Sequence, residues 1–247
     1  MNSSPIRLIV FDIDGVLTQG EAKALDLPLL ERLAGMNRAA RENPSQPAVT
    51  LCTGRPAPYV EAILQAIDGH VPGIFENGAG LYVPDGYQFL PHPALGDRSI
   101  FQAVRQRLEQ ALVQTGRAFF QPGKEYSLSL FASDPSATDR LYNQAVTALG
   151  PLRESVDLVY SASCLNVLPR GVDKGRGIDF LADQAGYTPA EMLGVGDSDV
   201  DLPFLAVVGH SAAPANANAN VQEVVQYVSP SPTTEGVRDI LNYFGLT

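Results

Sequence analysis

The chain has 247 residues, 45% of them hydrophobic, and 27 acidic against 17 basic side chains give a formal net charge of −10. This size suits one large domain or two smaller ones with a buried core, and an acidic chain without a basic block is not expected to bind nucleic acid. No run of about 18 apolar residues predicts a membrane-spanning helix, and residues 1–15 lack a signal-peptide pattern. Two distant cysteines favour neither a disulfide framework nor a zinc site, so we expect a cytoplasmic protein.

Strands and helices alternate in the first third of the chain. A β-rich apolar run at residues 6–11 predicts a strand buried on both faces of a parallel sheet, and residues 28–41 show the one-sided apolar pattern of a helix. A second short strand is predicted at residues 48–52, with a helix at residues 58–67. The repeated order of strand, polar turn and helix is typical of a parallel α/β sheet.

The middle of the chain has a different pattern, which indicates an α+β insert with antiparallel strands. Two short β-like runs flank the turn at residues 84–86 and predict a hairpin within residues 81–90. Further helices and strands are predicted at residues 99–115, 126–132, 137–149, 158–161 and 165–168. The earlier alternation then returns, with a helix at residues 175–185 and a strand at residues 192–196.

This order of elements predicts an α/β protein of two domains. The first is a Rossmann-like core with a parallel sheet, made of residues 1–84 and 169–247. The second is an inserted α+β cap domain, made of residues 85–168. Ligands of an open parallel sheet bind beyond the carboxyl ends of its strands, so the residues that follow the predicted strands are the candidates for function.

Two carboxylates follow the first predicted strand directly. Asp12 and Asp14 are separated by one apolar residue and followed by Gly15. Two acids this close repel each other, so the pair implies either a divalent cation or a shifted pKa. The alternative is an ordinary turn at the end of a strand, where Asp and Gly are common.

A second acidic turn follows the strand predicted at residues 192–196. It places Asp197, Asp199 and Asp201 within five residues. Hard oxygen ligands at two strand ends are what a Mg²⁺ site needs. A solvated surface turn would not explain why each acidic turn follows a buried strand.

Phosphate chemistry accounts for three further residues. A phosphoryl group is anionic, so hydroxyl, backbone N–H and cationic groups must surround it. Thr53 ends the second strand and Gly54 offers an accessible amide behind it. Lys174 is one of three lysines in the chain and stands at a predicted helix start, where its ammonium can balance the carboxylates.

Four motifs, in this order, resemble those of the haloacid dehalogenase superfamily. They are Asp12-Ile13-Asp14-Gly15-Val16-Leu17-Thr18, Thr53-Gly54-Arg55, Lys174-Gly175 and Gly196-Asp197-Ser198-Asp199-Val200-Asp201. The insert between the second and third motifs is similar to that of the branch with an α/β cap. This branch includes Cof-like sugar-phosphate phosphatases, sucrose-phosphate and mannosylphosphoglycerate phosphatases, archaeal phosphoglycolate phosphatases and phosphomannomutases.

The resemblance implies a role for each motif residue. Asp12 attacks phosphorus and forms an aspartyl-phosphate, and Asp14 serves as general acid and then as general base. Asp197 binds Mg²⁺ together with the Asp12 carboxylate and the Asp14 backbone carbonyl. Thr53 and the neighbouring amides hold phosphate oxygens.

Two roles implied by the resemblance concern charge balance and loop support. Lys174 orients the nucleophile, and Asp201 fixes either Lys174 or a metal-bound water. The branch usually has Asn before the final Asp of the fourth motif, where this chain has Val200. We interpret this as a change in loop support; Asp199 either compensates for it or faces water, and we expect water.

Two residues of the motif regions have open roles. Arg55 has two possible roles. It reaches the substrate or the cap, or it is simply an exposed arginine at a helix start. Asn77 either contacts substrate at the domain junction or belongs to a simple Asn-Gly turn.

The sequence therefore predicts a Mg²⁺-dependent phosphoric monoester hydrolase. Its expected partner is a small phosphate ester, either a sugar phosphate or a short hydroxy-acid phosphate such as phosphoglycolate. One alternative is a sugar-phosphate phosphomutase, which returns the phosphoryl group to another hydroxyl; another is a non-catalytic protein that binds a phosphate ligand. We expect a monomer or a homodimer.

Overall fold

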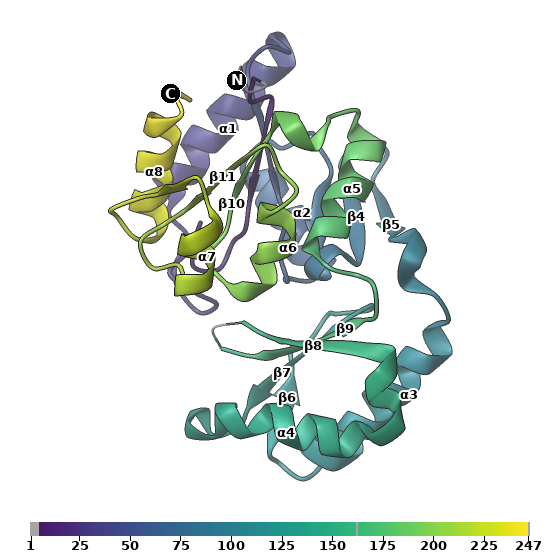
Figure 1. Ribbon diagram of the computed structural model, residues 1–247. Coiled ribbons are helices and arrows are strands. Elements are labelled where there is room, and N and C mark those ends of the chain that lie inside the picture. The colour runs from purple at the N-terminus through teal and green to yellow at the C-terminus, as the bar shows by residue number, and fades with distance from the viewer. Residues whose placement is uncertain (1–4, 162, 247) are drawn as a thin grey trace.

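The computed structural model, shown in Figure 1, describes residues 5–161 and 163–246. A parallel sheet of five strands, in the order β12-β11-β10-β1-β2, forms the centre of the larger part. Its strands are β1 (Leu8–Phe11), β2 (Ala48–Leu51), β10 (Met192–Val195), β11 (His210–Ala213) and β12 (Tyr227–Val228). The predicted α/β core with a parallel sheet is confirmed.

The strand register brings the motif residues to one edge of this sheet. β1 lies between β10 and β2, and Phe11 at its end is opposite Val195 and Leu51. All three strands are parallel, so the polar residues that follow them leave the sheet side by side.

Helices cover both faces of the parallel sheet. They are α1 (Leu27–Glu42), α2 (Ala57–Ala66), α5 (Lys174–Ala185), α6 (Leu202–Leu205), α7 (Ala219–Val224) and α8 (Thr233–Tyr243). Ile9 and Phe11 pack with α1 and α8, whereas Leu8 and Val10 pack with α5 and α6. Successive side chains of a strand point to opposite faces, so burial of both faces explains the continuous apolar run.

A small antiparallel sheet follows α2. It consists of β3 (Gly73–Phe75), β4 (Gly80–Val83) and β5 (Gln88–Pro91). β4 and β5 form a hairpin where one was predicted, whereas β3 is too short to give a sequence pattern. The division of the chain at residues 84 and 168 stays a prediction; in the structure β5 pairs with β4, which precedes that boundary.

The remaining sheet and its helices, residues 98–169, form what we call the cap. Its antiparallel strands are β6 (Ala118–Phe120), β7 (Leu128–Ala132), β8 (Val156–Tyr160) and β9 (Leu165–Pro169), in the order β6-β7-β9-β8. The helices α3 (Arg98–Leu108) and α4 (Thr138–Leu149) cover the side of this sheet that lies away from the core, as Figure 1 shows.

Alternation along the central cap strands separates apolar from polar side chains. Leu128 and Leu130 of β7, like Leu165 of β9, pack in the apolar cluster with the cap helices. Ser129 and Asn166 are register partners that lie between these residues, so they point to the opposite face, toward the core. Within the part of the chain that the structure describes, none of the helices has both the length and the apolar character needed to cross a lipid bilayer.

Candidate active site

A cavity of about 300 Å³ lies between the edge of the parallel sheet and the cap. The predicted site residues that line it are Asp12, Asp14, Thr53, Gly54, Arg55, Asn77, Lys174 and Asp197. Asp201 is fully buried behind them. A cavity of this size suits a small molecule.

Lys174 is the buried cation at the centre of this site. It is the first residue of α5, and Asp173 caps the helix by accepting a hydrogen bond from the Arg176 amide. Its Nζ lies 2.9 Å from Asp12 Oδ1 and 2.5 Å from Asp201 Oδ1, and its side chain is 1% exposed. Burial alone would lower the pKa of Lys174, but the two carboxylates outweigh that effect and raise it. Lys174 is therefore charged at neutral pH.

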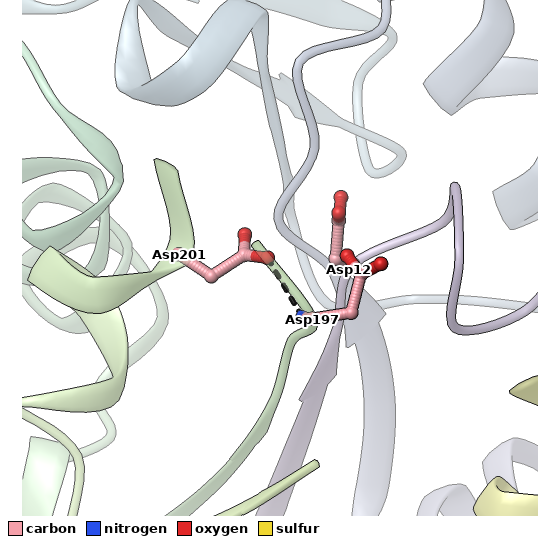
Figure 2. Close-up of side chains that lie close together, drawn as sticks. All are labelled: Asp12, Asp197 and Asp201. Carbon is pink, nitrogen blue, oxygen red and sulfur yellow. Dashed lines mark hydrogen bonds between the residues drawn. The ribbon is translucent and has the colours of Figure 1, made fainter. Parts of the chain in front are cut away.

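Asp201 supports the acidic turn from within. Its Oδ2 accepts hydrogen bonds from the Asp197 and Ser198 amides at 2.9 and 3.0 Å, and the first of these is drawn in Figure 2. Its Oδ1 is held by Lys174. Since both oxygens are engaged, Asp201 is a positioning residue and not a free metal ligand.

Asp12 and Asp197 fit a divalent cation. Carboxylate oxygens of Asp12, Asp197 and Asp201 lie within 4.8 Å of one another. Burial and the neighbouring carboxylates raise the pKa of Asp197 to about 8, and burial also raises the pKa of Asp12 against the effect of Lys174. A hard cation such as Mg²⁺ would relieve this repulsion, and its preferred ligands are oxygens of this kind.

Gly15 permits the two acidic turns to approach each other. A Cβ atom built on this residue would lie 2.0 Å from Asp197 Oδ2, and its φ of +83° is one that side chains disfavour. Any larger residue would push Asp197 away from Asp12.

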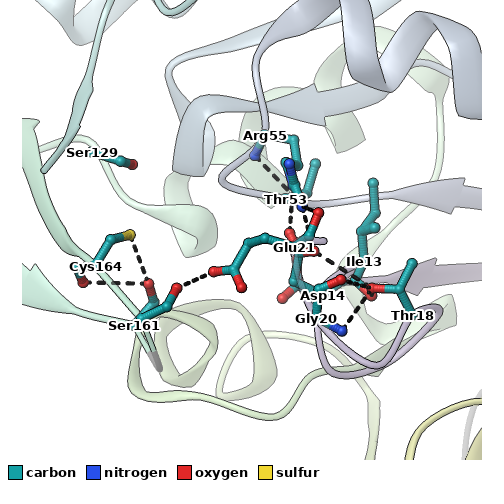
Figure 3. A network of polar contacts seen from close by, with 12 residues as sticks. Ile13, Asp14, Thr18, Gly20, Glu21, Thr53, Arg55, Ser129, Ser161 and Cys164 are labelled. Atoms are coloured by element: carbon teal, nitrogen blue, oxygen red, sulfur yellow. Dashed lines mark hydrogen bonds and ion pairs between the residues drawn. The ribbon is translucent and has the colours of Figure 1, made fainter. Parts of the chain in front are cut away.

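Arg55 binds Asp14, the residue predicted to act as general acid and base. Its Nε and Nη2 donate to the two carboxylate oxygens at 2.6 and 2.7 Å, and Nη2 also donates to the Glu21 carbonyl. Figure 3 shows this group beside Thr53, whose Oγ1 accepts a hydrogen bond from the Arg55 amide. Arg55 is thus not an exposed arginine at a helix start, because its side chain is only 12% exposed and fixes the orientation of Asp14.

Comparisons with known proteins agree with this geometry. Residues 127–241 match the family described as haloacid dehalogenase-like hydrolase. The phosphoglycolate phosphatase of Halorubrum lacusprofundi is 28% identical over 233 residues, covering 94% of this chain and 95% of that protein. That of Archaeoglobus fulgidus is 28% identical over 245 residues, covering 97% of each. These matches make the chain similar to haloacid dehalogenase-like hydrolases.

Solved structures of low sequence identity share the fold of this chain. A Thermoplasma acidophilum protein superposes with a TM-score of 0.74 at 23% identity, covering 98% of this chain and 100% of that one. The sucrose-phosphatase of Synechocystis superposes with a TM-score of 0.69 at 17% identity, covering 98% of each. The predicted resemblance to this family and the predicted enzyme class, a phosphoric monoester hydrolase, are confirmed.

The acidic loop at residues 196–201 is supported in a way that the sequence did not reveal. Asn218 and Asn220 both donate side-chain hydrogen bonds to Asp199 Oδ1 at 2.9 Å, and the Asn218 amide donates to the Asp197 carbonyl. The expectation that Asp199 faces water is therefore wrong. These hydrogen bonds come from a stretch of alternating Asn and Ala. They hold the acidic loop in place, whereas Val200 offers no side-chain hydrogen bond to it.

Asn77 lies where the core meets the cap. It is buried in the left-handed region at φ 57°, and its Nδ2 lies 3.5 Å from Asn166 Oδ1 of the cap. Among the residues that the structure describes, its own Oδ1 has no hydrogen-bond partner; this buried oxygen lies beside the place where a Cβ on Gly54 would stand. Asn77 therefore belongs to a tight turn and also presents an amide group to the cavity.

Lys124 is a cavity residue to which the sequence analysis gave no role. It lies on the turn between β6 and β7, is 6% exposed, and donates a hydrogen bond to Ser129 Oγ at 2.5 Å. No carboxylate of residues 5–161 or 163–246 forms an ion pair with it. The only signal in the sequence is the rarity of lysine, which does not place a residue in a cavity.

Burial lowers the pKa of Lys124 to about 8. Cys164 and Glu76 oppose this effect, while the cations Arg55 and Lys174 add to it. A charged ammonium without a counter-charge destabilises the folded state, because it loses hydration that no carboxylate replaces.

We expect Lys124→Met to raise the free energy of unfolding by about 3 kcal/mol near pH 7. The folded pKa lies below the ordinary value of 10.5, so the destabilisation is complete below about pH 8 and fades as the folded state deprotonates. The increase in the free energy of unfolding should vanish near pH 10.5. Urea unfolding across this pH range, without phosphate or carboxylate buffers, measures the difference in the free energy of unfolding. Lys23→Met, at an exposed position, is the control. A Lys124→Met variant that is less stable than the parent protein would contradict the expectation.

Proposed function

We propose that the chain is a Mg²⁺-dependent phosphatase that hydrolyses a small phosphorylated metabolite through an aspartyl-phosphate on Asp12. The observation that carries this proposal is the Asp12 carboxylate, paired with buried Lys174 and adjacent to Asp197, at the floor of the cavity between the core and the cap. The phosphoglycolate phosphatase relatives support a short hydroxy-acid phosphate as substrate, and a sugar phosphate stays the other predicted class. A cytoplasmic location and a monomeric or homodimeric state stay predictions.

The metal ligands in this proposal are the carboxylates of Asp12 and Asp197 and the backbone carbonyl of Asp14. Bound Mg²⁺ would neutralise part of the charge that otherwise repels a phosphate ester from three carboxylates.

The proposed reaction has two steps, formation of the aspartyl-phosphate and its hydrolysis. In the first, a carboxylate oxygen of Asp12 bonds to phosphorus, the ester P–O bond breaks, and Asp14 gives its proton to the leaving alkoxide. In the second, Asp14 takes a proton from water as the water oxygen attacks phosphorus, which releases phosphate and restores Asp12. Lys174 holds Asp12 through Oδ1 and so limits its rotation.

Two other residues assist these steps. The Thr53 hydroxyl has its oxygen bonded to the Arg55 amide, so its proton is available to a phosphate oxygen. Arg55 holds both carboxylate oxygens of Asp14, so one of these contacts has to open when Asp14 carries the proton that it transfers. The cap covers the site, which excludes bulk water and substrates as large as a protein.

The test is a panel of phosphorylated sugars and hydroxy acids, assayed with Mg²⁺ and with a chelator. We expect release of free phosphate that the chelator abolishes and Mg²⁺ restores. An isomerised sugar phosphate without free phosphate would favour the phosphomutase alternative. Absence of both products across the panel would contradict the proposal.

A further inference from the structure

The turn that carries Lys124 is fixed by the core, not by the cap alone. Glu76, a buried residue of the core, accepts hydrogen bonds from the backbone amides of Glu125, Tyr126 and Ser127 at 2.9, 2.9 and 2.7 Å. These three amides follow Lys124 directly. The position of the Lys124 ammonium is therefore set relative to the core sheet that carries the catalytic aspartate.

The cap residues around Lys124 determine how it can bind a ligand. Ser129 donates its hydroxyl proton to Asn166 Oδ1 at 2.7 Å, and Asn166 Nδ2 donates to Ser161 Oγ at 3.3 Å. Ser129 Oγ therefore accepts from Lys124. An ammonium has three N–H groups, and within the described chain only this one has a partner, which leaves two for a ligand in the cavity.

The charge of the cavity indicates which ligand group meets Lys124. Lys174 is already paired with two carboxylates at the floor, whereas buried Lys124 forms no ion pair with a carboxylate of the described residues. A neutral hydroxyl would leave this ammonium unpaired. A second phosphoryl group would add two negative charges near Asp12 and Asp14, but a single carboxylate balances one ammonium.

We propose that Lys124 binds a carboxylate on the leaving group of the substrate, so that the enzyme prefers short phosphate monoesters that carry one carboxylate. This inference rests on the proposed phosphatase function and narrows its substrate class. Lys124 is then a specificity residue, and Glu76 is the positioning residue that holds it.

The experiment compares two esters of similar size, 2-phosphoglycolate and 2-hydroxyethyl phosphate, which differ in a carboxylate against a neutral hydroxymethyl group. We expect the ratio of their kcat/KM values to favour the carboxylate and to fall at least about tenfold in Lys124→Met. Lys124→Arg keeps a cation and should retain part of the preference. Arg107→Met removes an exposed cation of the same cap and should leave the ratio unchanged.

Binding without turnover keeps the inference separate from the phosphatase proposal. Calorimetry of both esters on the Asp12→Asn variant, with and without Lys124→Met, should show the same loss of carboxylate preference. If no ester is turned over but this binding difference persists, the phosphatase proposal fails and the carboxylate site stands. A ratio that stays unchanged in Lys124→Met would overturn the inference. If kcat/KM stays the same for both esters, Lys124 contacts neither ester; if it falls equally for both, Lys124 acts on the phosphoryl group that they share.

Discussion

Asp12→Asn is expected to reduce turnover of any substrate ester by at least about 10⁴-fold. The amide that replaces the carboxylate is a poor nucleophile, so no aspartyl-phosphate forms. The surroundings of the nucleophile should persist, since Asn has nearly the same shape and Lys174 keeps its ion pair with Asp201. Initial rates of phosphate release with saturating Mg²⁺ measure the loss.

The fold of this variant is the control for a chemical effect. The pKa of Asp12 is raised by burial, so loss of its charge should not lower the free energy of unfolding measured without metal. Asp139→Asn makes the same exchange at an exposed position of the cap and should keep wild-type activity. Turnover of Asp12→Asn within about tenfold of wild type would show that the nucleophile is another group.

Lys174→Met is expected to affect both stability and turnover. The substitution leaves two buried carboxylates, Asp12 and Asp201, without their shared cation, which should cost about 3–5 kcal/mol of unfolding free energy. Turnover should fall by about 10²- to 10⁴-fold, because the nucleophile is no longer held and the charge of the phosphoryl group is no longer offset. Urea unfolding and steady-state rates give the two effects separately.

The pH dependence of this variant has a definite sign. Burial already raises the pKa of Asp12 above its unfolded value, and Lys174 opposes that effect, so loss of Lys174 should raise the pKa further. The folded variant then binds more protons than the unfolded chain, and its stability falls as pH rises. The destabilisation should therefore be larger near pH 8 than near pH 5. Adding Asp201→Asn should recover part of it by removing one unpaired charge. A loss of stability that is equal at both pH values would mean that packing, not charge, is responsible.

The motifs of the candidate site could be predicted from the sequence because each is local. Asp12, Asp14 and Thr53 come directly after short apolar runs, and a parallel sheet collects such strand ends at one edge. The structure places them in one cavity with Lys174, which stands at the start of a helix that its own periodicity predicts. The positions of these residues along the chain, directly after a strand or at a helix start, were enough to predict them as site residues.

The supports of these residues could not be predicted in the same way. Glu76 reaches amides about 50 positions away, and Asn218 holds an acidic loop from a stretch of alternating Asn and Ala. Neither contact leaves a periodic mark in the sequence, because each depends on how separate loops pack. Arg55 had two open roles until its distance to Asp14 was known.

The sequence by itself determined the α/β core, the order of its elements and the carboxylates and lysine expected to act on a phosphate ester, because strand periodicity and residue type are local properties. Only the tertiary structure decided which cap side chains face that site. Alternation divides β7 and β9 into two faces but does not say which face meets the core, and a turn such as the one that carries Lys124 has no period. The packing of the cap against the core decides which face of the cap sheet meets the site and where the turn with Lys124 lies. It therefore also decides which charges a substrate encounters.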